Sequence, residues 1–302
     1  MADELAFKTT MQFAYGEPRE LAAGIARLVA NNPGPLTFRG TNTYLVGTTE
    51  LAVIDPGPDD PAHFDAIMAA VGRRRVTQIL ITHAHRDHVD GLERLRQATG
   101  AETCGHGRSP RGEETAPMTP SGSEFINEDF CPDIVLHDGD AISGPGWRLE
   151  AVFTPGHAPD HLCFALPQRR VLFTGDHVMA WNTTVVAPPE GKMADYMRSL
   201  GRLAARDDRL YMPGHGGRID QPARWVKAYL LHRQWREQAI LDAIKSGHTT
   251  IEQIVSLVYS GIDDRLRNAA SFSALAHVEH LIERGLVQCE GPPTFDRRLS
   301  AA

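Results

Sequence analysis

Short runs of apolar and β-branched residues recur along the first two thirds of the chain and predict a set of β-strands. Most of these runs end at glycine, proline or aspartate, as strands followed by tight turns do. They lie at residues 42–47, 51–55, 76–81, 101–104, 134–136, 147–153, 161–166, 170–174 and 210–212. Helices are expected at residues 21–30 and 61–71 and from residue 92 onward. This mixture of strands and helices predicts an α/β fold.

After Pro222 the hydrophobic pattern changes to the spacing of helices. Apolar residues recur every three or four positions from Trp225 to Ile244, which predicts a long helix. Two more helices, the first with a threonine at its N-terminus, and two short strands are expected at residues 249–258, 267–284, 286–289 and 294–297. We therefore expect two domains, residues 1–217 and a winged-helix-like module at residues 218–302.

Composition narrows the class of protein. The 302 residues are 42% hydrophobic and 23% charged, which is ordinary for a soluble globular protein. No apolar run approaches the roughly 18 residues of a membrane span, and the N-terminus has no signal-peptide pattern, so no membrane partner is expected. The four cysteines are widely spaced and indicate free thiols in a reducing, cytoplasmic setting. The net charge of −7 argues against a basic nucleic-acid-binding surface.

One polar segment, residues 105–132, is longer than an ordinary connection and is rich in glycine, proline, serine and glutamate. Connections of this length inside a compact domain are uncommon, and many of them act as lids or binding loops. We expect this segment to contribute to substrate selection.

A dense group of histidine and aspartate residues follows the strand predicted at residues 76–81. His83, His85, Asp87 and His88 lie within six positions, between that strand and the next helix. Polar side chains in this number are costly at the end of a core strand unless they have a partner. Three later strands also end in a glycine-containing turn with a histidine or aspartate: His157, Asp176 and His215. Because all seven residues lie at strand ends, they are expected to meet at one edge of the fold.

These side chains suit two divalent metal ions. We assign His83, His85 and His157 to the first ion, Asp87, His88 and His215 to the second, and Asp176 to a bridge between them. Imidazole and carboxylate ligands favour Zn²⁺, with iron and manganese as alternatives. A hydroxide bridging the two ions is the expected nucleophile, and it would attack a carbonyl carbon or a phosphorus atom. Asp87 and Asp176 are the expected catalytic carboxylates.

Four further residues are candidates for supporting roles. Asp55 either caps a turn or orients a metal-bound histidine. His161 and His177, beside the ligand candidates, are either structural or able to orient a ligand or donate a proton. Trp181 either packs in the core or contacts the substrate.

The ligand motifs resemble those of the metallo-β-lactamase superfamily. His83-Ala84-His85-Arg86-Asp87-His88, Thr154-Pro155-Gly156-His157, Thr174-Gly175-Asp176 and Pro213-Gly214-His215 occur in the order typical of that family. The resemblance covers residues 38–217 and implies a four-layer αβ/βα sandwich with the metal site at one edge of the paired sheets.

The same motifs indicate which members of the superfamily the chain resembles most. Asp176 is similar to the bridging carboxylate of glyoxalase II and RNA-processing members, which the zinc β-lactamases lack. His85 stands where flavodiiron proteins have glutamate, so the resemblance implies hydrolysis. Residues 195–200 and 232–238 and the winged-helix-like end resemble the lactamase-β-like proteins related to a mitochondrial endoribonuclease.

Three functional hypotheses remain open. The first is a hydrolase that cleaves a thioester, ester, lactone or lactam in a small molecule. The second is an endoribonuclease acting on single-stranded RNA, and the third, least favoured, is a nucleic-acid-binding protein with a vestigial metal site. A homodimer formed through the C-terminal helices is a further expectation.

Overall fold

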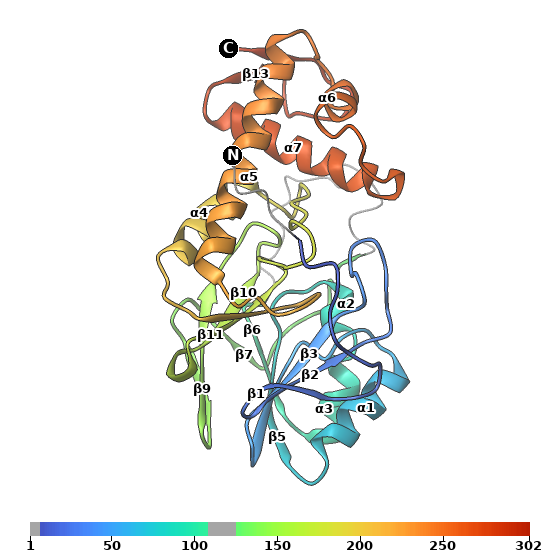
Figure 1. The fold of residues 1–302 in the computed structure, drawn as a ribbon, viewed down its shortest axis with the longest axis vertical. Coiled ribbons are helices and arrows are strands. Elements are labelled where there is room, and N and C mark those ends of the chain that lie inside the picture. The colour runs from blue at the N-terminus through green and yellow to red at the C-terminus, as the bar shows by residue number, and fades with distance from the viewer. Residues whose placement is uncertain (1–6, 108–124) are drawn as a thin grey trace.

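Two β-sheets lie face to face in the computed structural model, which describes residues 7–107 and 125–302 (Figure 1). The first sheet has seven strands in sequential order: β1 (Arg19–Ala22), β2 (Ile25–Val29), β3 (Asn42–Val46), β4 (Glu50–Ile54), β5 (Arg75–Leu80), β6 (Glu102–Gly105) and β7 (Ile134–Val135). The second has the order β12 (Leu210–Pro213), β11 (Val171–Gly175), β10 (Leu162–Leu166), β9 (Trp147–Phe153) and β8 (Ala141–Gly144).

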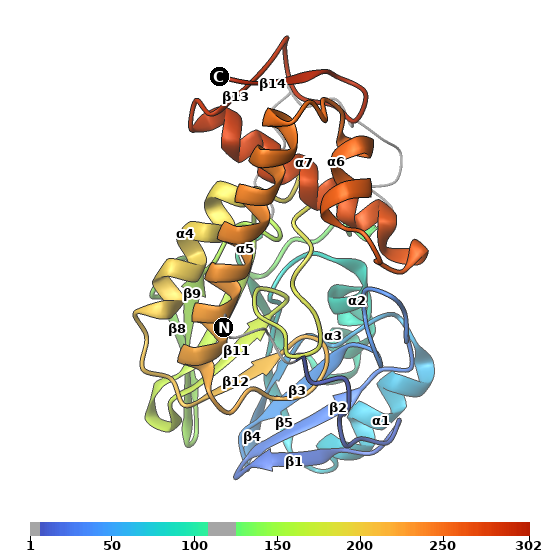
Figure 2. The same cartoon turned by 45° about the horizontal axis from the view of Figure 1, so that its top comes forward.

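Helices cover the outer face of each sheet. The first sheet carries α1 (Pro61–Val71) and α3 (Leu92–Thr99), and the second carries α4 (Met193–Ala204) and the long helix α5 (Pro222–Lys245) (Figure 2). The short helix α2 (Arg86–Val89) and a 3₁₀ turn at Pro167–Arg169 lie in connections. This arrangement confirms the predicted α/β fold with four layers in the order αβ/βα.

The hydrophobic core follows from the layers. Side chains from the facing surfaces of both sheets fill the space between them, and the ring centroids of Tyr44 on β3 and Phe173 on β11 lie 5.1 Å apart. A second set of apolar side chains packs between the first sheet and α1 and α3, and a third packs between the second sheet and α4 and α5. Because strands buried on both faces need apolar residues at successive positions, β10 and β11 are buried at every position.

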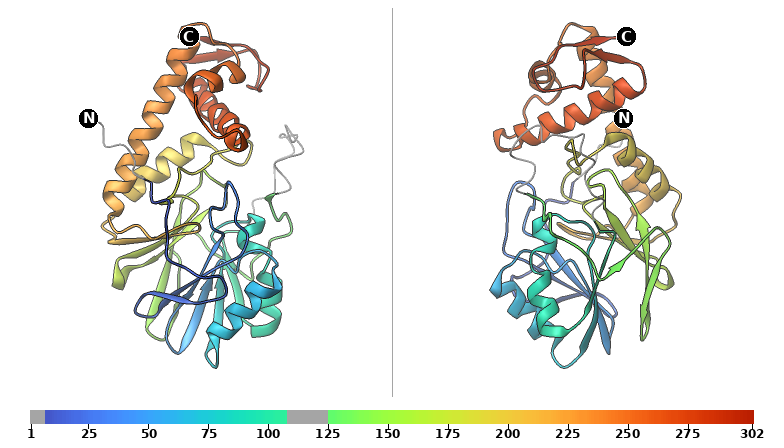
Figure 3. Two further views of the ribbon diagram at one scale, coloured as in Figure 1. Left: turned by 45° about the vertical axis from the view of Figure 1, so that its right-hand side comes forward. Right: turned by 180° about the vertical axis from the view of Figure 1, so that it is seen from behind.

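The C-terminal end forms three helices and a small two-stranded sheet at one end of the sandwich (Figure 3). Its elements are α5, α6 (Ile251–Val258), a 3₁₀ turn (Asp264–Leu266), α7 (Arg267–Glu283), β13 (Val287–Cys289) and β14 (Leu299–Ala301). Thr250 caps α6 as predicted, and Gln253 completes a capping box with it. Helix α5 contributes Val226 and Tyr229 to the core of the sandwich and Ile240 and Ile244 to that of the C-terminal end. The boundary between residues 217 and 218 stays a prediction.

Two local predictions are wrong. Residues 21–30 form no helix but part of the β1–β2 hairpin, which turns at Gly24 with a φ of +67°. Pairing with β3 along all of β2 outweighs the weak helical pattern of this short segment. The final strand lies at Leu299–Ala301 rather than at residues 294–297, because β13 pairs with the last residues of the chain.

One predicted feature, the long segment at residues 105–132, lies mostly outside the described residues. The end of this predicted lid is placed: Ile126 pairs with His85, and the Asn127 amide donates to the Ala84 carbonyl. All four cysteines are free. Among the helices of residues 7–107 and 125–302, none combines the length and apolar character that a membrane crossing needs.

Two glycines test how the turn after β9 packs against α4. Gly156 has a φ of +134°, and a Cβ there would stand 2.3 Å from the Tyr196 Cα. Gly156→Ala is therefore expected to lower the free energy of unfolding by more than about 2 kcal/mol. Gly201, exposed within α4, has no atom within 4 Å of its added Cβ, so Gly201→Ala is expected to add about 0.5–1 kcal/mol. Urea denaturation of both variants measures the difference, and equal stabilities would contradict the packing described.

Candidate metal centre

The seven predicted ligands meet at one edge of the sandwich, although they come from four separate segments. His83 and His85 follow β5, and Asp87 and His88 lie on the short helix α2 that comes next. The other three follow strands of the second sheet: His157 comes after β9, Asp176 after β11 and His215 after β12. Strand ends from both sheets therefore supply the site, as expected for polar groups that follow core strands.

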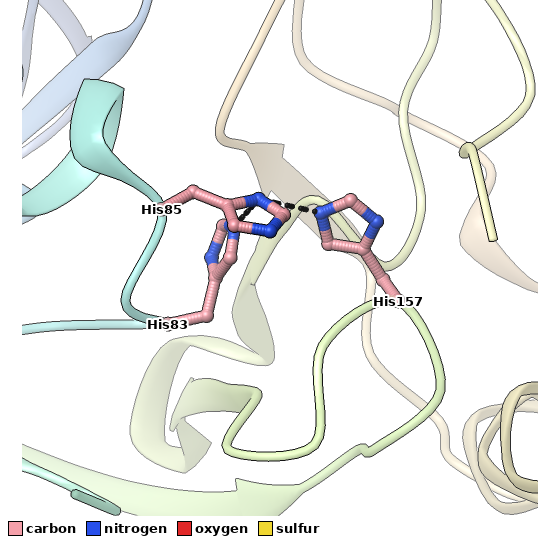
Figure 4. A group of neighbouring side chains, drawn as sticks. All are labelled: His83, His85 and His157. Carbon is pink, nitrogen blue, oxygen red and sulfur yellow. Dashed lines mark hydrogen bonds between the residues drawn. The ribbon is translucent and has the colours of Figure 1, made fainter. Parts of the chain in front are cut away.

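Three histidines form the first group, and their rings converge in Figure 4. The His85 Nδ1 atom lies 2.9 Å from the His83 Nε2 atom and 3.2 Å from the His157 Nε2 atom. His83 is almost completely buried, whereas His85 and His157 are partly accessible. Three imidazole nitrogens that face one common point form a donor set that would suit a divalent cation such as Zn²⁺.

Hydrogen bonds on the outer side of the His83 and His157 rings fix the tautomers of these two histidines. The Thr82 hydroxyl donates to the Asp55 carboxylate at 2.8 Å, so it accepts from His83 Nδ1 at 3.0 Å. His157 Nδ1 donates to the Val185 carbonyl at 2.7 Å. The Nε2 atoms of His83 and His157 therefore each carry a lone pair and no hydrogen. His85 Nδ1 lies between these two atoms and can carry at most one hydrogen. The geometry leaves lone pairs facing one another, an arrangement that a shared cation stabilises.

The second group is built from Asp87, His88 and His215. The Nε2 atoms of His88 and His215 lie 3.3 Å apart, and the Asp87 Oδ2 atom lies 3.2 Å from His215 Nε2 and 3.5 Å from His88 Nε2. Again the outer nitrogens are occupied: His88 Nδ1 donates to Asp55 at 2.9 Å and His215 Nδ1 donates to the Gly40 carbonyl at 3.2 Å. The inner atoms can therefore bind a second cation.

Asp176 lies between the two groups. Its Oδ2 atom is 3.3 Å from His215 Nε2 and 3.7 Å from His157 Nε2, and its Oδ1 atom is 3.5 Å from His88 Nε2. Within the described part of the chain Oδ1 is buried and has no hydrogen-bond partner. A buried carboxylate oxygen without a partner is costly, so its position fits a bridging ligand.

Electrostatics divides the histidines into two kinds. Burial lowers the pKa of His83 and His157, and it lowers the pKa of His85 to about 3, so these three imidazoles are neutral. Burial also acts to lower the pKa of His88 and His215, but nearby carboxylates outweigh it. They raise the pKa of His88 well above its usual value and that of His215 to about 9.

The two carboxylates respond in the opposite direction. Burial acts to raise the pKa of Asp87 and Asp176, but the charges of His88 and His215 outweigh it and lower both. Ionised carboxylates thus attract positive charge into a buried site. A divalent cation supplies that charge and takes the place of the protons on the two histidines.

Asp55 joins the two groups. Its Oδ1 atom accepts from the Thr82 amide at 2.8 Å, and its Oδ2 atom accepts from the Thr82 hydroxyl and from His88 Nδ1. The carboxylate therefore caps the turn after β5 and orients a histidine of each group, one directly and one through Thr82. Its φ of +52° places it in the left-handed region, which aspartate tolerates better than most residues.

The other three candidates surround the site without entering either group. His161 is buried and accepts from the Asp176 amide at 3.2 Å, while its Nδ1 atom lies 2.9 Å from the Thr154 hydroxyl. His177 is completely buried, and its ring centroid lies 4.6 Å from that of Tyr196. Trp181 is half-buried and stacks on Phe38 at 5.1 Å. Roles for these side chains as proton donor or substrate contact stay predictions.

Sequence reasoning missed three groups that hold the histidines in place. Thr82 directly precedes the histidine cluster, so its hydroxyl was a signal that could have been used. The carbonyls of Gly40 and Val185 are backbone atoms of distant segments, and no residue type in the sequence marks them.

Asp55→Asn tests whether Asp55 orients the histidines. Asparagine keeps the shape and tolerates the positive φ, but its amide cannot accept from both His88 and Thr82 as the carboxylate does. We expect metal affinity to fall about 10–100-fold with little change in thermal stability. Competition with a chelator measures the affinity, and Asp59→Asn, an exposed neighbour, is the control. Unchanged affinity would show that this carboxylate only caps the turn.

Comparisons with known proteins agree with this geometry. The chain matches the family model described as Metallo-beta-lactamase superfamily over residues 36–215 and that described as Beta-lactamase associated winged helix domain over residues 250–292. Lactamase-like protein adaB of Aspergillus niger is 29% identical over 93% of this chain and 87% of its own length. Atrochrysone carboxyl ACP thioesterase of Aspergillus fumigatus is 32% identical over 75% of this chain and 66% of its own length.

A solved structure shows a similar architecture. A metallo-beta-lactamase family protein from Thermus thermophilus superimposes with a TM-score of 0.76 at 28% identity, covering 94% of this chain and all of the other. The family match spans more than half of the chain and includes the six residues of the two groups and Asp176. The chain belongs to the metallo-beta-lactamase superfamily of hydrolases and carries the associated winged helix domain at its C-terminal end.

Proposed function

We propose that the protein hydrolyses a thioester or a related acyl bond of a small molecule. It would use two divalent metal ions for this reaction, and Zn²⁺ is the proposed metal. The observation that carries the proposal is the pair of side-chain groups with inward-facing lone pairs that share Asp176. Members of this superfamily generally bind divalent metal ions, usually zinc. The proposed ligands are His83, His85 and His157 for one ion, Asp87, His88 and His215 for the other, and Asp176 for both.

The bound ions would supply a hydroxide at neutral pH and polarise the carbonyl of the substrate. The chain's own residues decide where this chemistry takes place. Asp87 is 29% exposed at its side chain, whereas His88 and His215 are at most 1% exposed. The side with Asp87, His85 and His157 therefore faces solvent, and the buried His83, His88 and His215 form the closed back of the site. The Thr41 hydroxyl donates to Asp87 at 3.0 Å and holds that carboxylate toward His215.

The substrate class is proposed from two observations. The name of the Aspergillus fumigatus relative describes a thioesterase that acts on an acyl carrier protein, which supports an activated acyl bond. The chain has a net charge of −7, which does not favour the phosphate contacts that dominate RNA affinity. Cleavage of single-stranded RNA is the second candidate, because residues 250–292 match a winged helix domain and helix-turn-helix modules of this general kind bind nucleic acid.

Removal of single ligands tests the metal-dependent mechanism. His85→Ala and Asp176→Ala are each expected to lower kcat/KM at least about 100-fold, because each removes a donor from the proposed site. Metal-stripped wild-type protein should be inactive, and its turnover should return when Zn²⁺ is added. Metal content by elemental analysis and turnover of a chromogenic thioester measure both effects. Turnover by either variant in its metal-stripped form would contradict the mechanism.

A substrate panel separates the acyl and RNA hypotheses. We expect turnover of thioesters to exceed that of unstructured RNA, and thioester turnover to change little between low and high salt. Asp87→Ala serves as the control for contamination, since a nuclease signal that survives this substitution does not come from the site. RNA cleavage that is lost in Asp87→Ala and is faster than thioester cleavage would establish the second candidate instead.

A further inference from the structure

The loop between Asp176 and α4 has almost no regular structure of its own, yet it is well buried beside the proposed metal site. We propose that three side chains of α5 clamp this loop and thereby position His157. A helix that carries none of the seven proposed ligands would then set the affinity of one of the two metal sites. The inference rests on the proposed metal function. Its residues are Trp225, Tyr229 and Arg233, which lie four positions apart on one face of the helix.

The first two residues bind the start of the loop. The Trp225 indole N–H donates to the Met179 carbonyl at 2.8 Å. The Tyr229 hydroxyl accepts from the Met179 amide at 3.1 Å and lies 2.7 Å from the Met179 carbonyl and 2.5 Å from that of Asn182. These contacts satisfy backbone groups that a loop cannot satisfy for itself.

Arg233 binds the loop closer to the site. Its guanidinium donates to the Thr184 carbonyl and lies 5.1 Å from the centre of the Tyr196 ring. Arg233 is only 3% exposed, and within residues 7–107 and 125–302 no carboxylate forms an ion pair with it. A buried guanidinium without a counter-ion is costly, so this position needs a compensating role.

The clamped segment reaches two of the proposed ligands. The Thr184 hydroxyl donates to the Asp176 carbonyl at 2.7 Å, and the next residue, Val185, accepts from His157 Nδ1 at 2.7 Å. Because consecutive peptide units share a Cα atom and are each planar, fixing the Thr184 carbonyl restricts the direction of the Val185 carbonyl. That carbonyl holds His157 in the tautomer whose Nε2 atom faces His85.

The clamp makes a selective prediction. Loss of the Arg233 contact should weaken the ion held by His83, His85 and His157, because only that group contains His157. The shared ligand Asp176 is contacted by the Thr184 hydroxyl, which Arg233 does not bind, and only at its backbone carbonyl. The group of Asp87, His88 and His215 is held by Asp55, Thr41 and the Gly40 carbonyl, which lie on segments of the first sheet rather than on the clamped loop. A residue with a purely structural role would instead affect both ions alike or only the stability.

The test uses the whole chain and zinc titrated into metal-free protein against a chelator. Arg233→Met keeps the aliphatic stem and removes the donors, and it should weaken one of two equivalents about 10–100-fold while the other stays as in wild type. Arg233→Lys should restore part of the affinity. Arg236→Met is the matched control, because Arg236 lies on the same helix but donates to the Val258 carbonyl and lies over the Tyr259 ring, both at the C-terminal end. It should bind both ions as wild type does.

A second readout needs no metal. In ¹⁵N-histidine-labelled, metal-free protein, His157 should show a single Nδ1–H tautomer, and Arg233→Met should turn it into a mixture. If Arg233→Met does not fold, Tyr229→Phe, which removes only the hydroxyl, should weaken the same equivalent to a smaller extent.

The outcomes separate the two proposals. Wild-type protein that binds no ion would overturn the proposed function and the clamp with it. Wild-type protein that binds two ions, with Arg233→Met binding both equally tightly and keeping the His157 tautomer, would overturn the clamp alone. Equal weakening of both equivalents would also contradict it, since the helix would then act on the whole site rather than on His157.

Discussion

The candidate metal centre depends on holding the lone pairs of neighbouring imidazole rings close together in a buried position. The inner nitrogens of His83, His85 and His157 lie within about 3 Å of their neighbours, a distance at which two lone pairs repel unless a cation or proton lies between them. Each ring must therefore be held from behind. Every holding group found is a backbone carbonyl, a carboxylate or a hydroxyl that comes from a strand end or an adjacent loop.

This requirement explains the glycines beside the ligands. A Cβ on Gly214 would stand 2.6 Å from the Asp176 Oδ1 atom and 2.7 Å from the His88 Cε1 atom, and one on Gly175 would stand 2.6 Å from the His161 Nε2 atom. The ligand-carrying segments of the two sheets can approach this closely only where the residue between them has no side chain. The glycines thus belong to the geometry of the site, although they contribute no donor atom.

Sequence patterns anticipated the layers and the seven residues that meet, for different physical reasons. Strands such as β10 and β11 are buried on both faces and so appear as continuous apolar runs, and the histidines stand out because buried polar groups are rare. The hairpin at residues 19–29 was missed because β2 is stabilised by pairing with β3 and β1 by pairing with β2, and neither pairing is visible in a local pattern. The Val185 and Gly40 carbonyls were missed because every residue has one.

The same reasoning gives α5 a part in the site. A connection as irregular as the one between β11 and α4 must find partners for its backbone groups outside itself, and within the described chain α5 supplies them through Trp225, Tyr229 and Arg233. The helix also packs into the core of the C-terminal end through Ile240 and Ile244. One helix therefore packs into the core of the C-terminal end and binds the loop that holds His157. The C-terminal end and the metal edge are joined through this shared structural element.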